Sequence, residues 1–274
     1  MDLQFLPAVG AAHAGAFGDF CAALDAMPDL VTARSSHSHP TLLQFVVLDG
    51  GTGRIPEPGR FAEALIERGA SVGEPLVAAA SVGSRNMVDL LLGAGASVES
   101  EAPWTALEES IYWAHTDLAT YLRDEHQAAV PSLRAAAGLG DLEGMRRFMH
   151  DGVPTSEAGP VRFPWGVPSS EATDVLDQAL VIAAKNGGVP ATEALLGAGA
   201  NPNRCPPGVH EDGTALHLAA LFGRTEVVET LLQSGADPDA VDPRHRSTPA
   251  GWAQHQGHVA LADRLRAVER KQGL

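Results

Sequence analysis

The side chains best suited to acid–base chemistry or metal binding are 11 histidines and 34 acidic residues. His255 and His258 lie one helical step apart, but no cysteine or carboxylate completes a ligand set at the spacing of a known kind of metal site. The adjacent acids Glu108 and Glu109 would point apart on a helix, so they do not form a catalytic carboxylate pair. We therefore expect no metal and no cofactor.

Several short motifs that mark common catalytic sites are also missing. The sequence has no phosphate loop, dinucleotide fingerprint or zinc helix motif. We expect a binding protein and name no catalytic residue. An active site assembled from distant segments is the alternative that a motif search leaves open.

Aromatic and acidic side chains gather in one stretch. Tyr112 and Trp113 are adjacent, and the single basic residue near them is Arg123. The acids of this stretch are Glu99, Glu101, Glu108, Glu109, Asp117, Asp124 and Glu125. A cationic ligand would find both charge and ring faces here. The alternative is a solvated acidic surface that keeps the protein soluble.

The charge balance narrows the choice of partner. The formal net charge is −15, and Lys185 and Lys271 are the only lysines. Such a chain repels phosphate backbones and anionic lipid, so we expect neither nucleic acid nor a membrane surface as partner. A basic or apolar protein partner fits better. The preference for arginine over lysine, with much Ala and Gly, is typical of high-GC bacteria.

Compartment signals point to the cytoplasm. The N-terminus lacks the basic start and apolar stretch of a secretory signal, and no run of about 18 apolar residues predicts a membrane helix. The two cysteines, Cys21 and Cys205, give no disulfide framework. We therefore expect a reduced, cytoplasmic protein.

The sequence contains an internal repeat, which determines where the residues named above lie. Segments 214–237 (TALHLAALFGRTEVVETLLQSGAD) and 75–97 (PLVAAASVGSRNMVDLLLGAGAS) share a leucine, a small pair, a glycine, Leu-Leu and Gly-Ala in the same order. The pattern recurs around 183–201 and more weakly around 41–70, 105–107, 136–140 and 248–258, with a degenerate copy near 14–18. The mean spacing is about 34 residues, within the range of helical repeats.

Each copy predicts two short helices. Threonine caps the first helix, and a following proline suits the first helical position. The small pair allows close helix packing, and the glycine ends the helix in a left-handed conformation. Leu-Leu on the second helix fills the core between copies. Because no copy can bury its apolar face alone, the copies must stack.

The best-defined copies carry a family resemblance. Asp212-Gly213-Thr214-Ala215-Leu216-His217 and Gly257-His258 resemble the ankyrin-repeat pattern D-x-x-G-x-T-P-L-H-x-A-A followed by G-H. The resemblance implies an all-α, helical-hairpin solenoid of about eight repeats with short finger loops. It also implies a structural hydrogen bond between Thr214 and His217.

Departures from the pattern suggest the domain organisation. We expect one solenoid over 1–274, with a degenerate N-terminal repeat at 1–34 and a C-terminal capping repeat at 242–274. A Pro- and Gly-rich insertion at 153–176 separates five N-terminal copies from three C-terminal ones. The copy at 105 lacks its closing Gly-Ala, so its finger is expected to be missing, and the copy at 41 carries extra residues 51–59.

Ankyrin-like repeats bind through finger loops and through the two residues before the post-helix glycine, on the concave face. The residues that we expect to bind, with two aromatics of the insertion, are Phe17, Leu48, Val82, Tyr112, Trp113, Leu139, Phe163, Trp165, Lys185, Leu221, Phe222 and His255. This apolar strip indicates a groove for a protein or peptide. Loops could instead cover it.

The alternative function is a small-molecule site or enzyme. Its pocket would lie between the groove and the 153–176 insertion. Tyr112, Trp113, Phe163, Trp165 and Phe222 would line it. His150 or Lys185 would then serve as the acid–base group.

Overall fold

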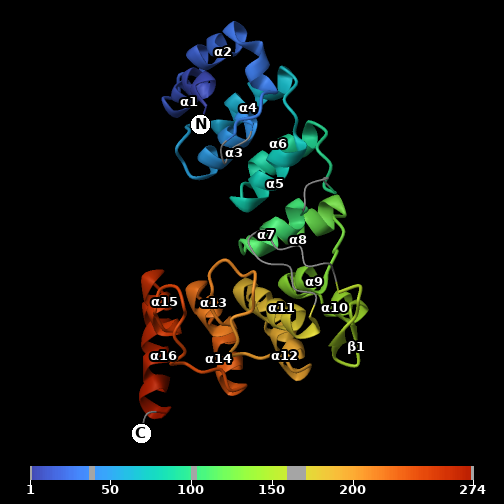
Figure 1. The fold of residues 1–274 in the computed structure, drawn as a ribbon, viewed down its shortest axis with the longest axis vertical. Coiled ribbons are helices and arrows are strands. Elements are labelled where there is room, and N and C mark those ends of the chain that lie inside the picture. The colour runs from blue at the N-terminus through green and yellow to red at the C-terminus, as the bar shows by residue number, and fades with distance from the viewer. Residues whose placement is uncertain (1, 37–40, 100–103, 159–170, 273–274) are drawn as a thin grey trace. The chain divides into compact units, whose positions relative to one another are not determined.

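The computed structural model describes residues 2–36, 41–99, 104–158 and 171–272, except for the side chains of 269–272. The contacts divide the chain into two compact units, Met1–Ala128 (unit 1) and Ala129–Leu274 (unit 2). Figure 1 shows that helices dominate both. The predicted all-α, ankyrin-type repeat fold is confirmed. One continuous solenoid of eight repeats stays a prediction.

Unit 1 is built from helix pairs in which each first helix packs on its second. Its elements are η1 (Leu3–Phe5), α1 (Leu6–His13), α2 (Phe17–Ala26), η2 (Pro28–Val31), α3 (Leu42–Gly51), α4 (Pro58–Glu67), α5 (Gly73–Ser81), α6 (Arg85–Gly93), α7 (Ala106–Tyr112) and α8 (Thr116–His126). The first helices α3, α5 and α7 contact one another in turn, and the second helices α2, α4 and α6 do the same. This gives two helical layers.

Unit 2 repeats the arrangement (Figure 1). Its elements are α9 (Leu133–Leu139), α10 (Leu142–Arg147), β1 (Met149–His150), β2 (Val153–Pro154), α11 (Ala172–Asn186), α12 (Val189–Gly197), α13 (Ala215–Leu221), α14 (Thr225–Gln233), α15 (Pro249–His255) and α16 (Val259–Gln272). The two strands form a small antiparallel hairpin that pairs Met149 with Pro154 and His150 with Val153. We call the side formed by α11, α13 and α15 the first-helix face.

Both ends of the predicted 153–176 insertion lie in described elements, and the insertion itself stays a prediction. The strand β2 occupies its first residues, and α11 begins at Ala172. The pair α9 and α10, which the sequence groups with the N-terminal copies, belongs to unit 2.

Threonine caps begin four of the first helices, as the repeat pattern predicts. The hydroxyl oxygens of Thr41 and Thr105 accept from backbone N–H groups three residues later, at 3.1 and 3.2 Å. Thr214 and Thr248 do the same at 3.4 Å. Each such cap typically contributes about 1 kcal/mol, because it satisfies a donor that the helix cannot.

His217 extends the cap of α13 into the next repeat. Its Nε2 lies 3.1 Å from the carbonyl oxygen of Ser247, which can only accept, so Nε2 carries the proton. Its Nδ1 therefore accepts from the Thr214 hydroxyl at 2.8 Å. The Thr–His bond implied by the resemblance is present. Burial lowers the pKa of His217, so the neutral form is favoured.

Stacking between repeats depends on the post-helix glycines. A Cβ added to Gly83 would lie 2.5 Å from the ring of His115, and one added to Gly223 would lie 2.7 Å from the ring of His258. In each case the histidine belongs to the following repeat. One leucine of each predicted pair fills the space between helices: Leu91 and Leu231 are fully buried, whereas Leu92 and Leu232 are half-buried.

The register of the first two copies differs from the prediction. The expected binding residues Phe17 and Leu48 place the post-helix glycines at Gly18 and Gly50. The left-handed glycines are instead Gly15 and Gly53, with φ of 67° and 76°. Gly50 lies inside α3, and Gly18 lies inside α2. The local pattern was ambiguous because both stretches offer several glycines.

Ala114 occupies the position that glycine holds in the other repeats. Its φ is 62°, which disfavours any residue with a Cβ. We expect Ala114→Gly to raise the free energy of unfolding by about 0.5–1 kcal/mol. Ala94→Gly is the matched control, because Ala94 has a φ of −84° and should lose stability with the same change. Urea unfolding followed by circular dichroism measures both. A loss of stability in both variants would contradict the strain at Ala114.

Asp242 organises the loop before α15. It is fully buried, and its carboxylate accepts from the backbone N–H groups of Arg244, His245 and Ser247 and from Trp252 Nε1, at 2.5–3.0 Å. Burial alone would raise the pKa of Asp242, but these hydrogen bonds together outweigh it and lower the pKa to about 2. The carboxylate thus stabilises the folded state.

We expect Asp242→Asn to destabilise the chain by roughly 2 kcal/mol at pH 7. The folded pKa lies below the unfolded value of about 3.9, so this contribution is present above pH 4 and disappears as the pH falls toward 2. The variant should therefore lose less stability than the parent chain between pH 5 and 3, as measured by urea midpoints. The exposed Asp239→Asn serves as control. Equal losses of stability between pH 5 and 3 in Asp242→Asn and Asp239→Asn would argue against the role of the Asp242 carboxylate.

Candidate functional site

One face of α11 is polar although it is buried. Asp174, Asp177, Gln178 and Lys185 recur at helical spacing on this face, and each is at most 7% exposed. The segment 198–214, which joins α12 to α13, contacts this face through the bonds described next. We call this segment the finger loop.

Ion pairs and hydrogen bonds fix the finger loop on α11. Arg204 pairs with Asp174, and its Nη1 donates to Asp177 Oδ2 at 3.0 Å. The hydrogen bond to Asp177 is the main reason why the pKa of Arg204 is raised. Gln178 Nε2 donates to the carbonyl oxygen of Pro207 at 2.6 Å. These contacts determine where the rest of the loop lies.

The loop places Glu211 on the ammonium group of Lys185. Lys185 is 0% exposed, and its Nζ donates to Glu211 Oε1. Nζ also lies 5.1 Å from the centre of the Phe222 ring, within the range of a cation–π contact. The second carboxylate oxygen, Glu211 Oε2, is buried and has no hydrogen-bond partner among the described residues. An unsatisfied acceptor of this kind is costly and suits a ligand donor.

Glu211 also lines a cleft of about 590 Å³ on the first-helix face of unit 2. Its walls come from α13, α15 and the loops before them. The lining residues are His210, Glu211, Leu221, Arg244, His245, Ser247, Gly251, Trp252, His255 and Gln256. The volume is within the range of ligand pockets, and it accommodates a large side chain of a partner.

The cleft combines an apolar interior with a polar rim. Leu221 and Trp252 supply the large apolar side chains. Arg244 and the exposed His245 and His255 lie at the rim, and Arg244 is held by a 3.1 Å hydrogen bond to the carbonyl oxygen of His210. The charge at this rim therefore does not attract a basic group.

The structure brings together several residues expected to bind in unit 2. Leu221 and His255 line the cleft, and Phe222 adjoins it through Lys185. Leu139 is half-buried at the end of α9 and does not line the cleft. Lys185 is 0% exposed and so differs from the expected exposed side chain; Glu211 of the finger loop and the ring of Phe222 lie against its ammonium group.

The predicted residues of unit 1 lie in separate places. Tyr112 is only 4% exposed, and its ring meets the half-buried Trp113 edge-on at 5.3 Å. Trp113 Nε1 donates to Glu109 Oε1 at 2.8 Å. Val82 lies against Gly51, and the half-buried Leu48 belongs to α3.

Phe17 is the first residue of α2 rather than the end of a first helix. Its ring packs on Phe61 of α4 at 5.5 Å, in the second-helix layer. Phe163 and Trp165 lie outside the described residues. His150 is exposed on β1, next to Asp151. The predicted binding role of all these residues stays a prediction.

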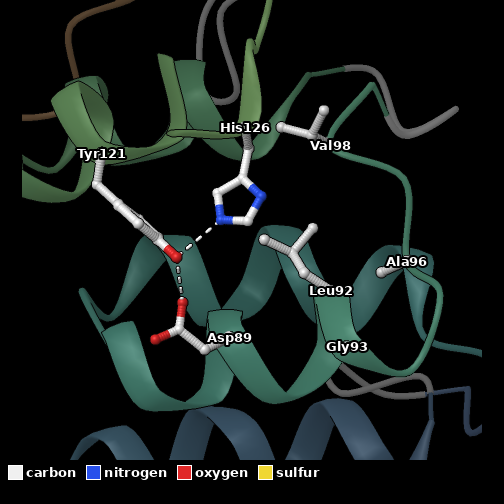
Figure 2. A pocket seen from close by; sticks show the side chains of 7 residues that line it. All are labelled: Asp89, Leu92, Gly93, Ala96, Val98, Tyr121 and His126. Carbon is white, nitrogen blue, oxygen red and sulfur yellow. Dashed lines mark hydrogen bonds between the residues drawn. The ribbon is translucent and has the colours of Figure 1, made fainter. Parts of the chain in front are cut away.

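A second cavity, of about 480 Å³, lies between the second helices α6 and α8 of unit 1 (Figure 2). The residues that line it are Asp89, Leu92, Gly93, Ala96, Val98, Tyr121 and His126. Sequence reasoning missed this site because it considered only the concave strip. The available signal was a carboxylate, a phenol and an imidazole on two successive second helices.

The described residues show no group of three or more His, Cys, Asp or Glu side chains that could hold a metal ion. In the same parts of the chain, no helix is both long enough and apolar enough to span a bilayer.

Comparisons with known proteins identify the family. A family model described as ankyrin repeats (3 copies) matches residues 133–242 and, in an overlapping match, residues 180–269. The two matches together span half of the chain, and the chain belongs to the ankyrin-repeat family. Among curated proteins, none matches this chain. Ankyrin repeats are generally protein–protein interaction modules.

The buried Lys185–Glu211 pair gives a prediction for unit 2. We expect Glu211→Leu to cost roughly 3 kcal/mol, because it leaves the buried ammonium group without its carboxylate. The double variant Lys185→Met/Glu211→Leu should recover most of this loss, since it removes both charges and keeps the volume. Urea unfolding of Lys185→Met, of Glu211→Leu and of the double variant measures the coupling between the two side chains. Additive losses would contradict it.

Proposed function

We propose that the chain holds a segment of a partner protein along its first-helix face, with an apolar side chain of the partner in the cleft of unit 2. The observation that carries this proposal is the cleft itself. Leu221 and Trp252 offer apolar contact, and Glu211 Oε2 offers an unsatisfied acceptor. A backbone or side-chain N–H of the partner would satisfy that acceptor.

The uneven distribution of charge supports a partner with both apolar and basic parts. Residues 1–128 contain 17 Asp and Glu against 6 Arg, a net charge of −11. Residues 129–274 contain 17 Asp and Glu against 13 Lys and Arg, a net charge of −4. A basic segment is therefore attracted to unit 1, and the apolar anchor fits unit 2. The two free cysteines agree with the proposed cytoplasmic location.

A small-molecule ligand is the second candidate. The volume of the cleft and the unsatisfied Glu211 Oε2 favour it, because both are features of pockets for small ligands. Native mass spectrometry of the purified chain tests it. A ligand of defined mass that is lost on unfolding would support this candidate.

The test of the proposed function uses peptides selected on the full chain from a random peptide display library. We expect the selected peptides to share a large apolar residue. Gln256→Trp, which fills the cleft from its exposed edge, should weaken their binding by about 10-fold or more in fluorescence titrations.

Gln233→Trp is the matched control, because Gln233 is an exposed glutamine at the end of α14 and does not line the cleft. It should leave peptide binding unchanged. Equal binding by the Gln256→Trp and Gln233→Trp variants would show that the cleft is not the site.

A further inference from the structure

Three side chains form a hydrogen-bonded chain between α6 and α8 of unit 1 (Figure 2). Tyr121 Oη lies 2.7 Å from Asp89 Oδ1 and 2.7 Å from His126 Nε2. An ionised carboxylate can only accept, so the phenol donates its single proton to Asp89. The imidazole must then donate to the phenol oxygen from Nε2. The bond to Asp89 is the main reason why the pKa of Tyr121 is raised, so the phenol remains a donor at neutral pH.

This arrangement fixes the tautomer of His126. Its proton is on Nε2, and Nδ1 carries a free lone pair in the neutral ring. Figure 2 shows Nδ1 on the side of the ring that faces Leu92 and Val98 rather than Tyr121. The edge-on contact of the two rings, with centroids 4.8 Å apart, holds the imidazole in this orientation.

The cavity therefore presents acceptors above an apolar wall. His126 Nδ1 and the half-exposed carboxylate of Asp89 are the acceptors, with 44% of the Asp89 side chain exposed. Leu92, Ala96 and Val98 form the apolar wall. No side-chain N–H donor points from the lining toward a ligand, since the phenol and the imidazole have both used their protons. Such a cavity suits a ligand with a donor head and an alkyl stem.

Arg85 contacts two of the residues that line this cavity. Its Nε lies 3.2 Å from both oxygens of Asp89, and its guanidinium lies 3.0 Å from the centre of the Tyr121 ring. Arg85 is not among the residues that line the cavity. It pairs with Asp89 and covers the Tyr121 ring, so it offsets part of the negative charge that a cation would meet.

We propose that this cavity binds an alkyl cation, the side chain of a lysine or arginine of the partner. The inference rests on the proposed function, because it gives the basic part of the partner a place in unit 1. The net charge of −11 in residues 1–128 favours a cation over an anion at this site. The alkyl stem would pack on Leu92 and Val98 while its N–H groups reach His126 Nδ1 and Asp89.

The experiment titrates the full chain with small probes and follows NMR signals of Gly93 and of the Ala96 and Val98 methyl groups. The probes are n-butylguanidinium, n-butylammonium and the neutral n-butylurea, with n-butyrate as the anion. We expect at least one of the two cations to bind about 5-fold or more tightly than n-butylurea, and butyrate not to bind. Equal binding of the neutral probe, or preference for butyrate, would overturn the proposal.

Two variants should act in opposite directions. Tyr121→Phe removes the hydroxyl that orients His126 and should weaken cation binding about 5-fold. Arg85→Gln removes the competing charge and should tighten it about 5-fold. Arg60→Gln is the matched control, because Arg60 also pairs with a carboxylate, that of Glu57, and covers an aromatic ring, that of Phe17, but lies outside the cavity. Weaker cation binding by Arg85→Gln would overturn the proposal.

This test is independent of the cleft in unit 2. If the chain selects no peptide but still binds the cation, also in the Gln256→Trp variant, the cavity in unit 1 is supported and the proposed binding of a partner protein is contradicted. If peptides are selected at the cleft but no cation binds, the proposed function is supported and the cation site in unit 1 is contradicted. A basic peptide that displaces n-butylguanidinium would show that a polypeptide can supply the cation.

Discussion

The close contact between one repeat and the next is the constraint on which the rest of this structure depends. Each helix pair has too little apolar surface on its inside to be stable alone, so it must cover its neighbour. The rings of His115 and His258 can lie against the preceding repeat only because Gly83 and Gly223 have no side chain. The same contact places successive first helices side by side, and the cleft of unit 2 forms at α13, α15 and the loops before them.

Polar groups then determine how the loops lie on this stack. Asp242 gathers the donors of the loop before α15, and His217 joins the cap of α13 to Ser247 in that loop. The finger loop is held in the same way by Arg204 on α11. Buried polar contacts of this kind add little net stability compared with apolar packing, but each permits only one position of its loop. The walls of the cleft come from these loops, so the polar contacts define its shape.

The sequence predicts the parts of the fold that local chemistry controls. The threonine caps, the burial of the first leucine of each pair and the His217 bond follow from patterns within one copy, and the structure confirms them. The register of the first two copies could not be predicted, because several nearby glycines satisfy the same pattern. The burial of Lys185 could not be predicted either, since it depends on a loop 26 residues away in the sequence. The chain of Asp89, Tyr121 and His126 requires knowing that α6 and α8 are neighbours, which no local pattern states.

The two candidate sites differ in the chemical groups of a partner that they can bind. The cleft of unit 2 has a buried carboxylate oxygen without a donor, surrounded by apolar walls and a rim of arginine and histidine. The cavity of unit 1 has acceptors in its lining and belongs to a strongly acidic unit. A neutral N–H beside an apolar side chain is the better match for the first, because a full positive charge would meet Lys185 and Arg244. A cation is the better match for the second, because its donors find lone pairs and its charge is attracted by the whole unit. The opposite demands of these two sites are what would distinguish the correct partner from a merely basic or merely apolar one.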